Sequence, residues 1–316
     1  MIRYIDTPAK SGRNRRRWIT LRRLMPLYLL LLPAIIYVLV FQYYPMYGAQ
    51  IAFRDFKVGS GIADSVWVGF KHFERFVNSI QFSRILTNTL RISIYSLIAG
   101  FLMKTILSLS LNSMRNLRYK KLVQTVTYMP HFISTVVMVG LLIRFMNPNM
   151  GAISMLIQAF GGTNRDMMGI ANAVPHLYVW SGIWQNAGWS TILFLATLAS
   201  VDPELHEAAI VDGASRVKRI WHIDIPVLVP TMVITLILDC GGIMSVGYEK
   251  MLLMQNDLNK STSEIISTYV YAQGIASASP KYSYATAIGL FNSIINFCMI
   301  VLVNGAAKRL NGTSLW

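Results

Sequence analysis

Six apolar stretches, each long enough to cross a lipid bilayer as a helix, constrain this 316-residue chain more than any other feature. The hydrocarbon core of a bilayer requires roughly 20 predominantly apolar residues in one helix. Helices satisfy their own backbone hydrogen bonds and can therefore lie in lipid. The sequence thus predicts an all-α integral membrane protein with six membrane-spanning helices. They are expected at residues 24–44, 89–111, 123–146, 174–199, 227–246 and 285–303.

The distribution of charge supports this interpretation and gives an orientation. Only 14% of the residues are charged, against roughly 25% in soluble domains. Basic residues gather in the arm 1–23, after the second stretch, after the fourth stretch and in the tail. Because cytoplasmic loops carry an excess of Lys and Arg, we expect both termini in the cytoplasm. The arm directly precedes a span, which favours attraction to anionic membrane lipid over binding to nucleic acid.

A polar segment rich in small residues separates the fourth and fifth stretches: EAAIVDGASRVKRIWHIDIPVLVP, residues 207–230. Asp202 is a suitable N-cap, and Pro203 fits the first position of a helix. Gly213 can end this helix with a positive φ. We therefore expect a short, capped cytoplasmic helix whose adjacent alanines leave one face without bulk. Such a helix suits docking into a groove on a soluble partner, and the alternative is an ordinary helical loop.

This segment resembles the EAA signature of ABC-importer permeases: Glu-Ala-Ala, three residues, Gly-Ala, then eight residues before an Ile-x-hydrophobic-Pro ending. The matching positions are Glu207, Ala208, Ala209, Gly213, Ala214, Ile223 and Pro226. Other stretches are similar to the LplB-type branch of the maltose-permease-like class, which imports complex oligosaccharides. These stretches are YMPHFISTVVMVGLLIRFMNPNMGAIS, GGIMSVGYEKMLLMQNDL, STYVYAQGI, YSYATAIGLFNSIINF and the terminal GTSLW.

The resemblance implies the type I ABC importer permease fold over residues 24–316, after the basic cytoplasmic arm 1–23. The segment 202–226 would be the coupling segment, because in this class the helix after the fourth span sits in a cleft of a cytoplasmic ATPase subunit. The residues implied in this contact are Glu207, Ala208, Ala209, Asp212, Gly213 and Ala214. ATP and Mg would be bound by the partner ATPase subunits, with no cofactor in this chain.

The implied function is import of oligosaccharides across a bacterial cytoplasmic membrane, by a transport subunit that is not itself an enzyme. The implied partners are a second homologous permease, two ATPase subunits, an extracellular sugar-binding lipoprotein and the oligosaccharide. The sequence has no G-x-x-x-x-G-K-[ST] loop to bind ATP. The alternative of an ion-coupled secondary transporter is disfavoured because it normally shows an inverted repeat and buried ionisable pairs. An integral-membrane enzyme would need a catalytic constellation that the sequence lacks.

Polar residues inside the apolar stretches are candidates for a substrate path, because placing them in lipid is costly. Asp239 lies about 12 residues into the fifth stretch, roughly 18 Å along a helix and so near the middle of the bilayer. The residues expected on its helical face are Thr235, Gly242 and Ser245. In the sixth stretch, Asn292 and Asn296 are four residues apart and share a face. The alternative for both sets is hydrogen bonding between packed helices.

The fourth stretch and the segment after the fifth add further candidates for the substrate path. Trp180, Trp184 and Trp189 are suited to stacking on sugar rings, together with Gln185 and Asn186, although aromatic stripes are more often lipid anchors or core. Tyr248 and Glu249 are expected outside the cell, at the entrance or against a delivery protein. The basic residues of the second stretch expected to extend toward lipid headgroups are Arg91 and Lys104.

Overall fold

The structure, a computed structural model, consists of helices with one short antiparallel ribbon in the part of the chain that it describes. The residues described are 11–59, 61–162, 165–312 and 314–315. Residues 1–10 of the basic arm, together with Thr313 and Trp316 of the GTSLW ending, lie outside the described residues. The predicted all-α membrane architecture is confirmed.

The elements from the first helix to the middle of the chain are α1 (Ser11–Val38), the π-helical turn η1 (Leu39–Tyr43), α2 (Tyr44–Met46), the 3-10 helix η2 (Tyr47–Phe53), β1 (Arg54–Asp55), β2 (Val66–Trp67), α3 (Lys71–Val77), α4 (Phe82–Asn112), α5 (Leu117–Tyr128), η3 (Met129–Phe132), α6 (Thr135–Phe145) and α7 (Ala152–Ala159). The elements that follow are η4 (Ala171–Ala173), α8 (Val174–Ser190), α9 (Ile192–Ala199), α10 (Pro203–Val211), α11 (Arg216–Arg219), the π-helical turn η5 (Ile220–Asp224), α12 (Ile225–Gly241), α13 (Tyr248–Met254), α14 (Lys260–Ser263), α15 (Ile266–Gly274) and α16 (Tyr282–Asn311).

Among the described residues, four stretches of helix are long and apolar enough to cross a membrane. They are Leu24–Phe53, Phe82–Asn112, Arg216–Gly241 and Tyr282–Arg309. A fifth span results if α5 with η3 and α6 are counted together, although they meet at an angle of 101°. Within the described part of the chain, six continuous spans at the expected positions are therefore not found.

The third expected span, 123–146, is broken by its own residues. Pro130 lies in the 3-10 turn η3, where its missing N–H and fixed φ interrupt the α-helical ladder. Ser134 then starts α6 as an N-cap, and its hydroxyl accepts a hydrogen bond from the backbone N–H of Val137. The apolar run is continuous in sequence, but its backbone changes direction at these residues.

The fourth expected span, 174–199, is divided into α8 and α9 at Thr191. The hydroxyl of Thr191 donates to the carbonyl oxygen of Gly188 at 2.6 Å. Gly188 also lies so close to α5 that a Cβ there would come within 2.2 Å of the carbonyl oxygen of Thr127. The absence of a side chain at Gly188 thus allows α5 and α8 to pack closely.

The fifth expected span ends earlier than predicted, at Gly241 rather than at residue 246. A turn follows, in which the backbone N–H of Met244 donates to Oδ1 of Asn296 on α16 at 2.9 Å. Asp239 is consequently two residues from the end of α12. The expectation that Gly242 and Ser245 share its helical face is wrong, because neither residue is in the helix.

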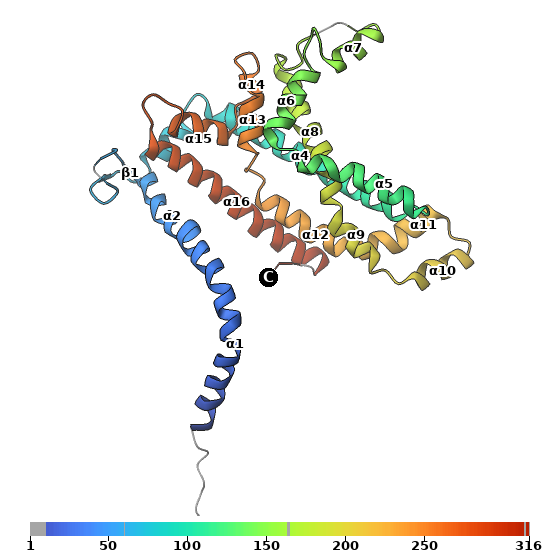
Figure 1. The fold of residues 1–316 in the computed structure, drawn as a ribbon. Coiled ribbons are helices and arrows are strands. Elements are labelled where there is room, and N and C mark those ends of the chain that lie inside the picture. The colour runs from blue at the N-terminus through green and yellow to red at the C-terminus, as the bar shows by residue number, and fades with distance from the viewer. Residues whose placement is uncertain (1–10, 60, 163–164, 313, 316) are drawn as a thin grey trace, which may run out of the picture.

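The helices α12 and α16 pack along each other, and α4 packs against α8 and α9 (Figure 1). Helices α10 and α11 lie at one end of this bundle, and α6, α13, α14 and α15 lie at the other (Figure 1). Helix α1 extends away from the bundle, and every side chain from residue 25 to residue 47 is exposed. In a membrane, this apolar surface faces lipid or another subunit.

The largest apolar clusters lie toward the end formed by α6, α13 and α15. One cluster joins Ile92 of α4, Met138 of α6 and Met251 of α13. Another joins Ile85 of α4 to Ile288 of α16. These buried contacts fix α4 and α13, which form two walls of the cavity described next.

Candidate functional site

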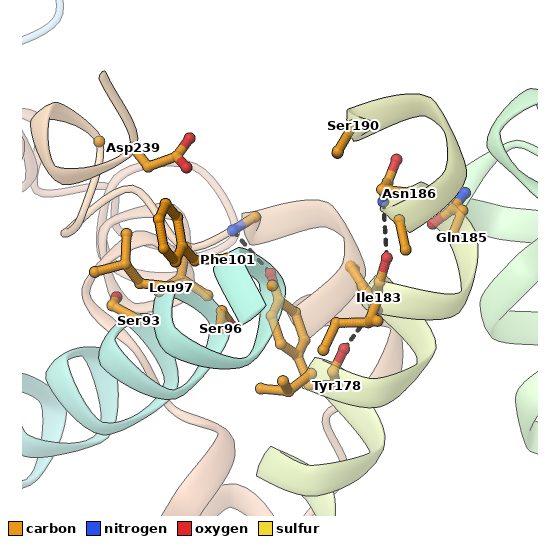
Figure 2. Close-up of a pocket in the computed structure, with 18 of the residues that line it drawn as sticks. Ser93, Ser96, Leu97, Phe101, Tyr178, Ile183, Gln185, Asn186, Ser190 and Asp239 are labelled. Atoms are coloured by element: carbon orange, nitrogen blue, oxygen red, sulfur yellow. Dashed lines mark hydrogen bonds between the residues drawn. The ribbon is translucent and has the colours of Figure 1, made fainter. Parts of the chain in front are cut away.

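A cavity of about 510 Å³ lies between α4, α8, the end of α12 and the start of α13. Figure 2 shows Ser96 and Phe101 of α4 across from Asn186 of α8, with Asp239 at the edge. Its wall mixes apolar side chains with hydrogen-bonding groups. The polar or charged side chains that line it are Ser93, Ser96, Lys104, Thr135, Tyr178, Gln185, Asn186, Ser190, Asp239, Ser245 and Lys250.

Lys104 and Asp239 form an ion pair that joins α4 to α12 along this cavity. Nζ of Lys104 lies 2.8 Å from Oδ2 of Asp239. The Lys104 side chain is only 10% exposed, whereas that of Asp239 is 48% exposed. The ammonium group also lies 5.3 Å from the ring centroid of Phe101 and 5.4 Å from that of Phe194. The expectation that Lys104 extends toward lipid headgroups is therefore wrong, because its charge is neutralised inside the protein.

Lys250 supplies the second ammonium group of the cavity, and this group contacts both the backbone carbonyl and the ring of Tyr178. Nζ of Lys250 donates to the carbonyl oxygen of Tyr178 at 2.7 Å and lies 4.5 Å from the centroid of its ring. The Tyr178 hydroxyl in turn accepts a hydrogen bond from the backbone N–H of Gly247 at 3.0 Å. Burial lowers the pKa of Lys250 to about 7, because the surroundings disfavour its charged form.

The amide side chains of Gln185 and Asn186 both reach the cavity, but they have different partners. Gln185 is buried, and its Nε2 donates to the carbonyl oxygen of Ile133 at 2.8 Å. Oδ1 of Asn186 lies 2.9 Å from Nδ1 of His131. The ring of His131 stacks on the ring of Trp189, with the two ring centroids 4.5 Å apart. Gln185 thus fixes the break between η3 and α6 against α8.

The remaining predicted substrate-path residues do not line this cavity. The Trp184 side chain is exposed on the surface of α8. Tyr248 packs against Tyr271, with ring centroids 5.5 Å apart, and Glu249 is exposed beside it. Asn296 donates from Nδ2 to the hydroxyl of Ser245 at 2.9 Å. The structure therefore brings together Asp239, Gln185 and Asn186, while their roles in transport stay predictions.

Asn292 differs from Asn296 although the two share a face of α16. Its Oδ1 is buried and has no hydrogen-bond partner in the part of the chain that the structure describes. Asn296, by contrast, is satisfied through Met244 and Ser245 and fixes the turn after α12. Of the two, Asn292 is the one whose buried side-chain oxygen has no partner among the described residues.

The predicted coupling segment, 202–226, begins with the capped helix α10 and continues through α11 and η5 to the start of α12. Oδ1 of Asp202 accepts a hydrogen bond from the backbone N–H of Glu204 at 3.0 Å, and Pro203 is the first helical residue. Gly213 has a φ of +75° and follows the helix end, as predicted from its lack of a Cβ. The predicted contact residues of this segment are Glu207, Ala208, Ala209, Asp212, Gly213 and Ala214. All of them are exposed except the two alanines Ala209 and Ala214, which are partly buried.

Asp224 ties this segment to the bundle, a role that the sequence did not predict. It is buried, with Oδ1 3.3 Å from Nε2 of His206 on α10 and 3.3 Å from Nδ2 of Asn112 at the end of α4. Helix α10 is therefore joined through Asp224 to two of the helices that wall the cavity, α4 and α12. These contacts anchor α10 to the bundle.

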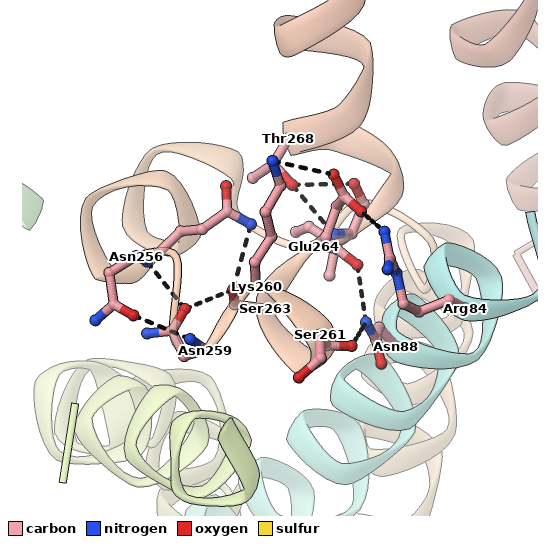
Figure 3. Close-up of polar contacts among 11 residues, drawn as sticks. Arg84, Asn88, Asn256, Asn259, Lys260, Ser261, Ser263, Glu264 and Thr268 are labelled. Carbon is pink, nitrogen blue, oxygen red and sulfur yellow. Dashed lines mark hydrogen bonds and ion pairs between the residues drawn. The ribbon is translucent and has the colours of Figure 1, made fainter. Parts of the chain in front are cut away.

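A polar network at the opposite end holds the segment before α15 against α4 (Figure 3). Arg84 pairs with the carboxylate of Glu264. Nδ2 of Asn88 donates to the carbonyl oxygens of Ser261 at 2.9 Å and of Glu264 at 3.0 Å. Asn259 is fully buried and donates to the carbonyl oxygen of Met168 at 2.8 Å. The network fixes the connection between α13 and α15, and thereby the position of α13 at the cavity.

Comparison with known proteins places this geometry in a family. Residues 96–312 match the model of the binding-protein-dependent transport system inner membrane component. Protein LplB of Bacillus subtilis (strain 168) is 40% identical over 312 residues, covering 98% of each chain. The polygalacturonan/rhamnogalacturonan transport system permease protein YteP of the same organism is 38% identical over 307 residues, covering 97% of this chain and 95% of YteP.

Two solved structures resemble the whole arrangement of helices. One is a bacterial ABC transporter involved in the import of the acidic polysaccharide alginate, with a TM-score of 0.85 and 36% identity, covering 94% of this chain and 99% of that chain. The other is an alginate ABC transporter in complex with an alginate pentasaccharide-bound periplasmic protein, with a TM-score of 0.86 and 36% identity, covering 95% and 100%. The chain belongs to the family of binding-protein-dependent transport system inner membrane components.

Proposed function

We propose that this chain is the permease subunit of an ATP-driven ABC importer for oligosaccharides, and that the cavity between α4, α8, α12 and α13 is part of the sugar's path. The cavity is the observation that carries the proposal. Its wall combines hydroxyl, amide, carboxylate and ammonium groups with apolar side chains. Sugars have hydroxyl groups that need hydrogen-bond partners and apolar ring faces that need contact surface, and binding pockets commonly provide both.

The named activities of the relatives support an oligosaccharide as the substrate. YteP is named as a permease for polygalacturonan and rhamnogalacturonan transport, and the solved alginate transporter was captured with a periplasmic protein carrying a pentasaccharide. By analogy, an extracellular sugar-binding protein would deliver the oligosaccharide to the end of this chain that carries α13 to α15. The sugar would then pass along the cavity, in contact with Asp239 and Asn186.

The energy would come from outside this chain, through α10. In the proposed assembly, α10 lies in the cytoplasm and sits in a groove of one of two ATPase subunits, which bind ATP and Mg. Its exposed alanine and charged rim would allow close approach, and Asp224 would transmit its displacement to α4 and α12. A second homologous permease would complete the path, and its surface is a suitable neighbour for the exposed helix α1.

The proposal is tested by transport into proteoliposomes that contain the assembled complex. Sugar-binding protein loaded with a radiolabelled oligosaccharide is added outside, and ATP is enclosed inside. We expect uptake that requires ATP, Mg and the binding protein, and that is unchanged when ionophores dissipate proton and sodium gradients. Uptake driven by an ion gradient without ATP would contradict the proposal and would support a secondary transporter.

A further inference from the structure

Lys250 carries a charge that the described part of the chain does not neutralise. No carboxylate of the described residues lies within 4.0 Å of its Nζ, in contrast to Lys104, which pairs with Asp239. The residue as a whole is only 8% exposed. An ammonium group taken out of water without a counter-ion is strongly disfavoured. The charged form of Lys250 would therefore be stabilised by an anion from outside the described residues.

The hydrogen bonding of Lys250 leaves donors open toward the cavity. An ammonium group has three N–H donors, and a single hydrogen bond from it, to the carbonyl oxygen of Tyr178, is formed within the described residues. Gly182 lies beside the group, and a Cβ at Gly182 would come within 3.1 Å of Nζ. Because Lys250, Tyr178 and Gly182 all line the cavity, the missing side chain of Gly182 keeps space next to the charge.

A purely structural role would not require a charge at this position. The bond to Tyr178 ties α13 to α8, but a neutral amide donor would make the same contact without the penalty of burying an ammonium group. The cavity also has an uneven balance of charge. Two ammonium groups line it, with Asp239 as the one carboxylate among the described lining residues. The excess is one positive charge, which suits a group with a single negative charge, such as a carboxylate.

We propose that Lys250 is a specificity-determining residue that binds the carboxylate of an acidic sugar, so that the cavity selects uronic-acid oligosaccharides over neutral ones. The inference rests on the function proposed above. Lys250 would form charge-assisted hydrogen bonds with the sugar carboxylate, while Asp239 and the hydroxyl and amide groups of the wall contact the sugar hydroxyls. The lowered pKa of Lys250 agrees with a site that is completed by an anionic ligand.

The test is equilibrium dialysis of the complete complex, embedded in lipid nanodiscs, against labelled trigalacturonate and its fully methyl-esterified form. The ester has the same rings and linkages without the negative charge, and omission of the binding protein leaves selection to the permease. We expect tighter binding of the acid by the unmodified complex, by about ten-fold, the usual effect of one charge-assisted hydrogen bond. Lys250→Met should remove this preference, and Lys250→Arg should restore it in part.

Lys260→Met is the matched control, because its side chain is 55% exposed and lies outside the cavity. It should keep the full preference for the acid. Equal binding of the acid and the ester by the unmodified complex would overturn the inference and leave the proposed function intact, as would a preference that survives in Lys250→Met. A loss of both ligands together in Lys250→Met would assign the residue a structural role. If the unmodified complex binds neither compound, the cavity does not select acidic sugars and the inference fails, whereas the proposed function is still decided by the uptake assay with the binding protein.

Discussion

Removal of the Asp239 carboxylate is expected to destabilise the protein and to reduce transport. In Asp239→Ala, the buried ammonium group of Lys104 loses its partner at 2.8 Å. Breaking a buried ion pair from one side costs about 3–5 kcal/mol. The lower end, about 3 kcal/mol, applies here, because Asp239 is half exposed and water can reach the pair. The nearby rings of Phe101 and Phe194 offset a small part of this cost.

The double variant Lys104→Met with Asp239→Leu separates stability from transport. Replacing both members of a buried pair by apolar residues is often neutral or stabilising, so this variant should recover the thermal stability of the unmodified complex in detergent. Its uptake of labelled oligosaccharide should stay low, because the carboxylate that faces the cavity is gone. Unchanged stability of Asp239→Ala would refute the role of the ion pair. Full uptake by the double variant would show that Asp239 acts only through Lys104.

Three further perturbations have defined outcomes. Gly213→Val forces a β-branched residue to a φ of +75°, with no atom within 4 Å of its Cβ, which strains the backbone by about 1–2 kcal/mol. Less sugar should then be imported per ATP hydrolysed, whereas Gly69→Val, equally free of clashes at a φ of +59°, should leave this ratio unchanged. Equal ratios in both variants would contradict a coupling role. Asp202→Ala removes the N-cap of α10 at a cost of about 1 kcal/mol, so amide hydrogen exchange in its first turn should accelerate about five-fold, and unaltered exchange would show that other contacts hold the helix. Binding of trigalacturonate should weaken as the pH rises through about 7, where Lys250 loses its proton. Lys250→Met should abolish this pH dependence, although Lys104, Asp239 and Tyr178 are still present in the variant. If the pH dependence persists in Lys250→Met, it arises from one of those groups.

Features that depend on neighbouring residues in the sequence were predicted well. The cap at Asp202, the turn at Gly213 and the helical character of the apolar stretches all follow from local backbone chemistry. The break at Pro130 had a local signal as well, but the uninterrupted apolar run around it favoured one continuous helix. Hydropathy measures whether a segment can lie in lipid and does not report where its backbone turns.

Features that depend on contacts between distant segments were not predicted. Lys104 and Asp239 are 135 residues apart in the sequence, and only the packing of α4 against α12 shows that they neutralise each other. Lys250 lies in GGIMSVGYEKMLLMQNDL, one of the stretches that carry the family resemblance, but the sequence did not single out this residue. Its surroundings are visible only in the structure, where it donates to the carbonyl oxygen of Tyr178 and has no carboxylate partner among the described residues. Of the polar and aromatic residues chosen on α8, Gln185 and Asn186 line the cavity, whereas Trp184 is exposed on the surface of the helix, and their roles in transport stay predictions.

Crosslinking from one position of α10 tests whether this helix docks on a cytoplasmic ATPase subunit. Ala208→Cys is introduced after Cys240 and Cys298 have been replaced by Ser, and the assembled complex in inverted membrane vesicles is treated with a short thiol-to-amine crosslinker. We predict a covalent product between this chain and the ATPase subunit, whose yield changes when ATP is added. A cysteine that forms no such product, and that reacts in intact cells with a membrane-impermeant maleimide, would show that α10 lies on the extracellular side and does not contact the ATPase subunit.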